Sequence, residues 1–203
     1  MGIIIGLTGS IATGKSTISK MFDSFNIPVV DADVISREVV EIGRPAYQQI
    51  VDCFGEKVLH EDRTLNRKQL GSIIFKDETK RKQLNEIVHP EVRKQMLEQR
   101  DGYLNEGNKA VVLDIPLLFE SDLAHFADRT LVVYVDEETQ LKRLMDRDGS
   151  SKEDALERIR SQIPIQEKAE RADEVIDNSG TIEESFQQLK RILTEWNVLK
   201  KSD

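Results

Sequence analysis

The sequence predicts an α/β protein in which a five-stranded parallel sheet is flanked by helices. Five short apolar segments alternate with stretches of helical periodicity, and they lie near residues 3–8, 27–30, 109–114, 130–136 and 174–177. Their apolar residues are continuous rather than alternating, which is typical of parallel strands covered on both faces. Strands that alternate with helices in this way indicate right-handed crossover connections.

The first strand leads into a loop with the spacing Gly-x-x-x-x-Gly-Lys-Ser, and a helix with one apolar face follows. This context favours a phosphate-binding P-loop over a glycine turn that merely matches the spacing. Gly9 and Gly14 allow tight turns that bring backbone N–H groups against phosphate oxygens. We expect Lys15 to reach the β- and γ-phosphates and the Ser16 hydroxyl to ligate Mg²⁺. The predicted nucleotide-binding residues are Gly9, Ser10, Ile11, Ala12, Thr13, Gly14, Lys15, Ser16 and Thr17.

The length and composition of the chain limit its domain count, its partners and its location in the cell. A chain of 203 residues predicts one domain, or one domain with insertions. The net charge of −8 argues against a nucleic-acid backbone as the partner. No run of 18 apolar residues exists, and the apolar N-terminus is interpreted as a strand rather than a signal peptide, so no membrane partner is expected. The single cysteine, Cys53, excludes an intrachain disulfide, and we predict a cytoplasmic location.

A helical insertion is predicted between the second and third strands. Asn66 is the expected N-cap of one of its helices, and Pro90 is expected in the first turn of another. Its many basic residues form either a solvated surface or, for a few of them, a binding wall for an acidic substrate. The expected helices cover residues 46–54, 66–76, 77–88 and 90–105.

Carboxylates gather at the predicted carboxyl edge of the sheet, where ligands bind in such folds. Asp114 follows the third strand and is either a carboxylate that supports Mg²⁺ or a helix cap. Asp136 is expected to cap a helix over residues 137–147, and Thr181 opens the final helix with a capping-box pattern. The four strands after the first end in Asp31, Asp114, Asp136 and Asp177.

Asp33 is the most informative carboxylate outside the P-loop, because it lies two residues beyond a strand end. It is interpreted either as the N-cap of a helix over residues 34–42 or as a group that takes a proton from an attacking hydroxyl. Arg143 and Arg147 lie one helical turn apart and form a candidate clamp for phosphate oxygens. His89 precedes Pro90 and is interpreted from the residues alone as structural.

The motifs together resemble those of the dephospho-CoA kinase family, in the same order over residues 3–180. Each motif other than the P-loop is a weak signal when taken alone. The complete set in this order is specific for the family. Besides the P-loop, the motifs are Asp31-Ala32-Asp33, Phe54-Gly55 through Leu65-Asn66-Arg67, His89-Pro90, Pro116-Leu117-Leu118-Phe119-Glu120, Gln140-x-x-Arg143-x-x-x-Arg147 and Ala172-Asp173-x-x-Ile176-x-Asn178-x-Gly180.

The resemblance implies transfer of the ATP γ-phosphate to the ribose 3′-hydroxyl of dephospho-CoA, with Mg²⁺. It implies a P-loop kinase core over residues 1–59 and 106–203, a lid over about 140–165 and a substrate domain over 60–105. Among the residues it implies for catalysis, Lys15 and Arg143 act on phosphate and Asp33 is the base. Asn178 is expected near the adenine of ATP, and Asp33, Arg37 and His89 are expected to bind the acceptor. The family loop is richer in glycine than this one, where Ser10 and Ala12 stand.

Three other functions use the same phosphate-binding loop. The first is a kinase on the same core that acts on a nucleotide or nucleoside, and the later motifs argue against it. The second is a GTPase-type switch, which needs a guanine-reading Asn-Lys-x-Asp after a late strand; Asn108-Lys109-Ala110-Val111 precedes a strand and lacks the Asp. The third is a regulatory ATP-binding module without an acceptor. The expected partners are small-molecule substrates, and a monomer or small homo-oligomer is expected.

Overall fold

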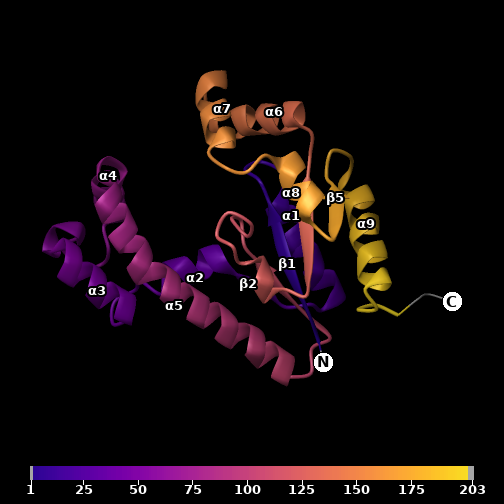
Figure 1. Cartoon of the computed structure of the whole chain (residues 1–203), viewed down its shortest axis with the longest axis horizontal. Helices are drawn as coiled ribbons and strands as arrows, with labels where there is room; N and C mark the ends of the chain where they lie inside the picture. The colour runs from indigo at the N-terminus through magenta and orange to yellow at the C-terminus, as the bar shows by residue number, and fades with distance from the viewer. Residues whose placement is uncertain (1, 201–203) are drawn as a thin grey trace. The chain divides into compact units, whose positions relative to one another are not determined.

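The computed structural model describes residues 2–200. Its sheet has five strands in the order β2-β3-β1-β4-β5, which confirms the predicted fold class (Figure 1). The pairings of β1 with β3, of β1 with β4 and of β4 with β5 are parallel. The strands are β1 (Ile3–Gly9), β2 (Val29–Asp31), β3 (Ala110–Asp114), β4 (Arg129–Tyr134) and β5 (Glu174–Asp177).

Helices connect the strands, as the sequence predicts. Short 3-10 turns lie at η1 (Phe22–Phe25), η2 (Glu56–Val58) and η3 (Ala124–Phe126). The α-helices are α1 (Lys15–Met21), α2 (Ala32–Glu38), α3 (Pro45–Phe54), α4 (Arg67–Lys76), α5 (Glu78–Asn105), α6 (Glu137–Asp148), α7 (Lys152–Arg160), α8 (Ile165–Arg171) and α9 (Ile182–Glu195). Among residues 2–200, no helix is long and apolar enough to cross a membrane.

The chain forms two compact units. The first comprises residues 1–30 and 100–203 and holds most of the sheet, and the second comprises residues 31–99. The second unit therefore starts earlier in the chain than the expected substrate domain at residue 60. That residues 60–105 bind a substrate stays a prediction.

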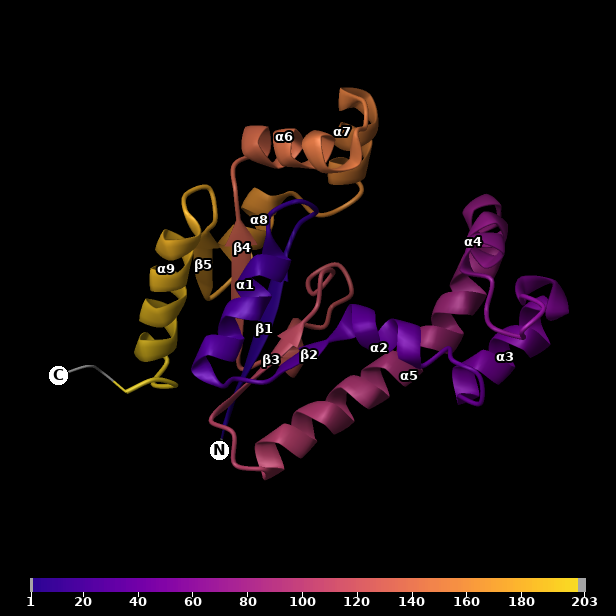
Figure 2. The same cartoon turned by 180° about the vertical axis from the view of Figure 1, so that it is seen from behind.

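The first unit is built in layers around its sheet. Helices α1 and α9 lie on the face turned toward the viewer in Figure 2, and α8 lies on the face turned toward the viewer in Figure 1. The core under α1 and α9 is apolar because each strand contributes alternate side chains to that face. Its buried members include Ile5, Leu7, Ile18, Phe22, Leu131, Val133, Ile176, Leu189 and Ile192.

The strand register brings the carboxyl ends of the strands together. Leu7 in β1 is level with Asp114 at the end of β3, and Gly9 is level with Val133 near the end of β4. Because parallel strands end at one edge, the loop after β1 starts beside the carboxylate of Asp114. Helices α6 and α7 lie beyond this edge in both views (Figures 1 and 2).

Two expectations about helices were wrong. Residues 78–105 form one helix of 28 residues with Pro90 inside it, whereas the sequence predicted two helices separated before Pro90. Proline removes one hydrogen bond and favours a kink, but it does not end a helix whose flanking turns are well formed. The helix after β2 starts at Ala32 and not at residue 34, so Asp33 lies within its first turn.

Candidate active site

The P-loop connects β1 to α1 through an unusual backbone. Gly14 has φ +87°, and a Cβ atom there would lie 2.2 Å from Nδ2 of Asn178. Gly9 has no room either, because its Cβ would lie 2.7 Å from Oγ1 of Thr13. Ala12 has φ +62°, a left-handed conformation that costs an alanine about 1–2 kcal/mol. The two glycines are required by this geometry, and Ala12 holds a strained left-handed conformation between them.

Lys15 is the first residue of α1, and its ammonium group pairs with the carboxylate of Asp114. The side chain of Lys15 is 18% exposed and that of Asp114 is 3% exposed. The parallel register explains this contact, since β1 and β3 are neighbours that end at the same edge. Asp114 therefore lies at the phosphate loop, which is the position that a carboxylate supporting Mg²⁺ would need. Its support of Mg²⁺ stays a prediction. Ser16 and Thr17 follow on the exposed first turn of α1.

Arg143 and Asn178 converge on the P-loop from two different elements. Nη2 of Arg143, in α6, donates to the backbone oxygen of Asn178 at 3.0 Å. Nδ2 of Asn178 donates to the backbone oxygen of Thr13 at 2.8 Å, and its Oδ1 accepts from Oγ of Ser185 at 2.9 Å. The Asn178 side chain is thus directed at the loop that it supports. Contact of Asn178 with adenine stays a prediction.

The two arginines of the expected clamp have different partners. Arg147 pairs with Asp148, and Arg158 in α7 pairs with the same carboxylate. These hydrogen bonds lower the pKa of Asp148 to about 2. The structure therefore brings Arg143 to the P-loop. Arg147 instead pairs with its neighbour Asp148 within α6, and it is Arg158 that joins α7 to α6 through the same carboxylate.

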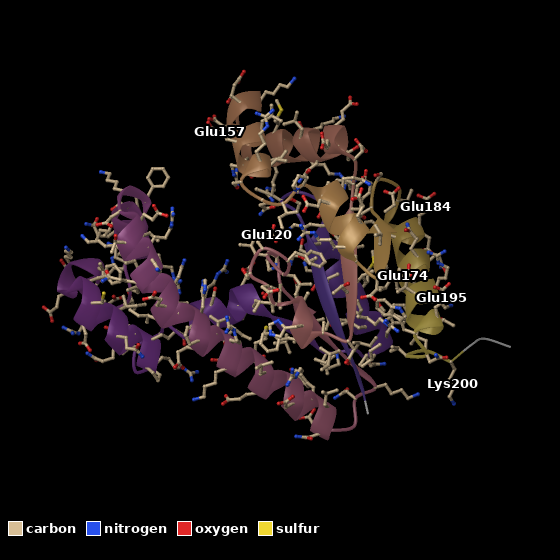
Figure 3. The ribbon with its side chains drawn as sticks, viewed as in Figure 1. Glu120, Glu157, Glu174, Glu184, Glu195 and Lys200 are labelled. Carbon is tan, nitrogen blue, oxygen red and sulfur yellow. The ribbon has the colours of Figure 1, made fainter. Side chains whose placement is uncertain are left out.

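A buried lysine lies behind the P-loop. Lys168 in α8 is 0% exposed, and its ammonium nitrogen lies 2.7 Å from Oε1 of Glu120. The same group donates to the backbone oxygens of Gly9 at 2.9 Å and Pro116 at 3.3 Å. Burial lowers the pKa of Lys168, and the Glu120 carboxylate partly offsets that effect. Glu120 lies in the loop that follows β3, where Figure 3 labels it.

Replacing Lys168 by methionine is expected to lower the free energy of unfolding by about 3 kcal/mol, because it leaves the Glu120 carboxylate without its buried cation. Urea denaturation measures this change. Lys190→Met in α9, which replaces an exposed lysine, is the matched control and should change stability by about 0.5 kcal/mol or less. Equal stability of the two variants would contradict the structural role of the pair.

The second unit holds two carboxylates, Asp31 at the end of β2 and Asp33 just after it. Asp31, and not Asp33, is the N-cap of α2, because its side chain accepts from the backbone N–H groups of Asp33 at 2.8 Å and Val34 at 3.0 Å. Asp33 itself is exposed on the first turn of the helix. The capping interpretation of Asp33 is therefore wrong, which leaves its carboxylate available for another role.

The other residues expected at the acceptor also belong to this unit. Arg37 lies one turn after Asp33 in α2, and its backbone oxygen accepts from Nη2 of Arg67 at 3.1 Å. His89 lies in α5, where burial and the nearby Arg93 lower its pKa. An apolar cavity of ≈ 240 Å³ in the same unit has Ser36 and Arg67 among its lining residues. Roles for these side chains in substrate binding stay predictions.

Sequence reasoning missed two residues that touch the P-loop, Gln162 and Lys168. Oε1 of Gln162 accepts from Oγ of Ser10 at 2.7 Å and from the backbone N–H of Ile11 at 2.9 Å. A signal existed for Lys168, because it falls three residues after Ile165, on the apolar face of α8. For Gln162 the sequence offers no local signal, since it lies in the short connection between α7 and α8.

Comparisons with known proteins agree with this arrangement. The sequence model for dephospho-CoA kinase matches residues 3–184. A protein of Bacillus cereus named dephospho-CoA kinase is 58% identical over 199 residues, which cover 98% of this chain and 100% of that protein. Among solved structures, a protein of Thermus thermophilus has a TM-score of 0.81 at 36% identity, with 96% of this chain and 97% of the other covered. Dephospho-CoA kinase from Campylobacter jejuni has a TM-score of 0.74 at 34% identity, with 97% and 98% covered. This chain belongs to the dephospho-CoA kinase family.

Proposed function

We propose that this protein transfers the γ-phosphate of ATP to the 3′-hydroxyl of the ribose of dephospho-CoA, the final step of coenzyme A biosynthesis. Membership in the family over nearly the full chain is the observation that carries this proposal. An intact phosphate loop with Lys15 and Asp114 at its base supports it. Both substrates are small molecules, and we expect a cytoplasmic enzyme that is a monomer or small homo-oligomer.

In the proposed mechanism the phosphoryl group moves directly from donor to acceptor, without a phosphoenzyme. Lys15 leaves Asp114 for the β- and γ-phosphates, because those oxygens carry more negative charge than one carboxylate. Arg143 stabilises charge on the equatorial oxygens as the bond to the donor breaks. Asp33 orients the ribose hydroxyl and accepts its proton. The expected lid over α6 and α7 excludes water, which would otherwise hydrolyse ATP.

The residues at the loop fit a magnesium ion that is bound mainly through phosphate. Among residues 2–200, no group of three or more His, Cys, Asp or Glu side chains is placed to hold a metal. Mg²⁺ keeps several waters and needs one or two protein ligands besides phosphate oxygens. The Ser16 hydroxyl would hold it, and Asp114 would support it. When bound, the ion neutralises charge on the β- and γ-phosphates.

The experiment that tests the function measures ATP consumption with dephospho-CoA and with a panel of nucleoside monophosphates. In the presence of ATP, fast turnover is expected with dephospho-CoA and with none of the monophosphates. A chelator that removes Mg²⁺ should abolish this turnover. Turnover with a monophosphate instead would agree with the proposed phosphoryl transfer but would show that the acceptor is not dephospho-CoA. Slow hydrolysis without transfer to any acceptor would indicate a regulatory ATP-binding module.

Arg143→Ala is expected to lower kcat on the order of a hundredfold, because it removes a charged donor that acts on the transferring group. Lys142→Ala is the matched control, since Lys142 is an exposed cation at the preceding position of the same helix. Steady-state kinetics with both substrates measures the two variants. An Arg143→Ala enzyme as active as the control would remove Arg143 from the mechanism.

A further inference from the structure

Two glutamine side chains hold the backbone of one P-loop residue from opposite sides. Nε2 of Gln140 donates to the backbone oxygen of Ile11 at 2.8 Å. Oε1 of Gln162 accepts from the backbone N–H of Ile11 at 2.9 Å and from Oγ of Ser10 at 2.7 Å. Gln140 lies in the first turn of α6 and Gln162 follows α7, so the two glutamines lie at the two ends of the α6–α7 segment in sequence.

The hydrogen bonds act where the loop is strained. Ala12 follows Ile11 and has φ +62°, which an alanine adopts only when its surroundings impose it. Fixing the N–H and the C=O of Ile11 sets the orientation of both peptide groups that lead into Ala12. The N–H of Thr13 closes a turn on the backbone oxygen of Ser10 at 3.2 Å, and the N–H groups of Gly14 and Lys15 follow at the start of α1, where P-loops bind phosphate. The glutamines therefore act on the shape of the phosphate site without lying in it.

Stability alone does not explain Gln140. Its side chain is 0% exposed, and its Oε1 has no hydrogen-bond partner among the described residues. A buried acceptor without a partner lowers stability. An apolar side chain of similar length would fill the same space without this cost, but it would not donate to Ile11. The favourable contact that the structure shows for the Gln140 amide is therefore the one with the loop.

The segment that carries Gln162 is itself fastened to the loop. The backbone N–H of Ile163 donates to Oε1 of Glu120 at 3.2 Å, and the same carboxylate pairs with the buried Lys168. Lys168 in turn donates to the backbone oxygen of Gly9. The start of the P-loop and the end of the α6–α7 segment are therefore connected through two separate routes.

We propose that Gln140 and Gln162 are positioning residues that hold the P-loop in its phosphate-binding shape and couple the α6–α7 segment to nucleotide binding. The inference rests on the proposed function, because it assigns ATP to this loop. It predicts that loss of either glutamine weakens ATP binding before any acceptor is present. It also predicts that movement of the α6–α7 segment changes the affinity for ATP.

The test replaces each glutamine by methionine, which has a similar length and no amide. Titration calorimetry with ATP and Mg²⁺, without acceptor, should show dissociation constants raised about tenfold for Gln140→Met and for Gln162→Met. The KM for dephospho-CoA should change by less than about twofold. Gln140→Met removes the unpartnered oxygen but also leaves the backbone oxygen of Ile11 without its donor, so its melting temperature should stay within about 3 °C of the wild type. Gln166→Met is the control, since Gln166 is exposed in α8 and its amide donates to Glu170 in the same helix.

A double variant tests whether the hydroxyl of Ser10 affects ATP binding only through its hydrogen bond to Gln162. Adding Ser10→Ala to Gln162→Met should weaken ATP binding by no more than about twofold, because the hydroxyl has already lost its acceptor. ATP binding within about twofold of wild type in both methionine variants would overturn the proposal. A loss of ATP affinity accompanied by an equal loss for dephospho-CoA and a melting temperature lowered by more than about 3 °C would also overturn it. The wild-type kinase assay tests the proposed function separately, so the two failures are distinguishable.

Discussion

Lys15→Ala is expected to reduce kcat by about a thousandfold. The ammonium group lies at the base of the phosphate loop, beside a carboxylate that is 3% exposed. In a site with little water, a fixed positive charge lowers the energy of the transferring phosphoryl group far more than it would in solution. Rapid-quench measurement of product formation at saturating substrates gives kcat directly.

Lys15→Arg is the control that separates charge from geometry. Arginine keeps the positive charge, but its planar group cannot reproduce the position of a compact ammonium ion. We expect partial activity in Lys15→Arg and melting temperatures that show both variants to be folded. A Lys15→Ala enzyme with an unimpaired transfer rate would contradict the assignment of the loop.

Asp33→Asn is expected to lower kcat by about a thousandfold while the KM for ATP changes little. Removing a general base costs roughly 10²–10⁴-fold in rate. The carboxylate is exposed on the first turn of α2 and is not the N-cap of that helix, so its loss should leave the local structure intact. Steady-state kinetics at varied ATP and varied dephospho-CoA measures both parameters.

Asp31→Asn is the matched control for this prediction. Asp31 lies two residues away and caps α2 through its side-chain oxygen, and asparagine caps helices as well as aspartate does. The control removes one negative charge from the same turn and should retain most of the activity. Near-wild-type kcat in Asp33→Asn, or an equal loss in both variants, would remove Asp33 from the role of base.

Much of the fold was predictable because the signals for it are local. Each strand is a short apolar run, and the phosphate loop is defined by its own residues and by the strand and helix that flank it. The caps at Asn66, Asp136 and Thr181 were predicted and are present, since capping depends on residues within one turn. The position of Asp114 beside the P-loop also followed from the sequence, because parallel strands end at a common edge of the sheet.

The parts that were not predicted depend on contacts between residues far apart in the chain. Gln162 contacts Ser10, and Lys168 contacts Gly9, across more than 150 residues. Helical spacing can place Lys168 on the buried face of α8, but it does not identify Gly9 as its partner. The prediction of two helices separated before Pro90 was wrong for a different reason. Proline often marks a helix end, but here the well-formed turns on either side of Pro90 keep the helix continuous.

The most direct test of the account is the structure of the reaction product. After incubation of the protein with ATP, Mg²⁺ and dephospho-CoA, phosphorus and proton NMR of the purified product locates the new phosphate. The account predicts a phosphomonoester on the ribose 3′-oxygen and one ADP formed for each product molecule. A phosphate at another position, or ADP formed without a phosphorylated acceptor, would contradict it.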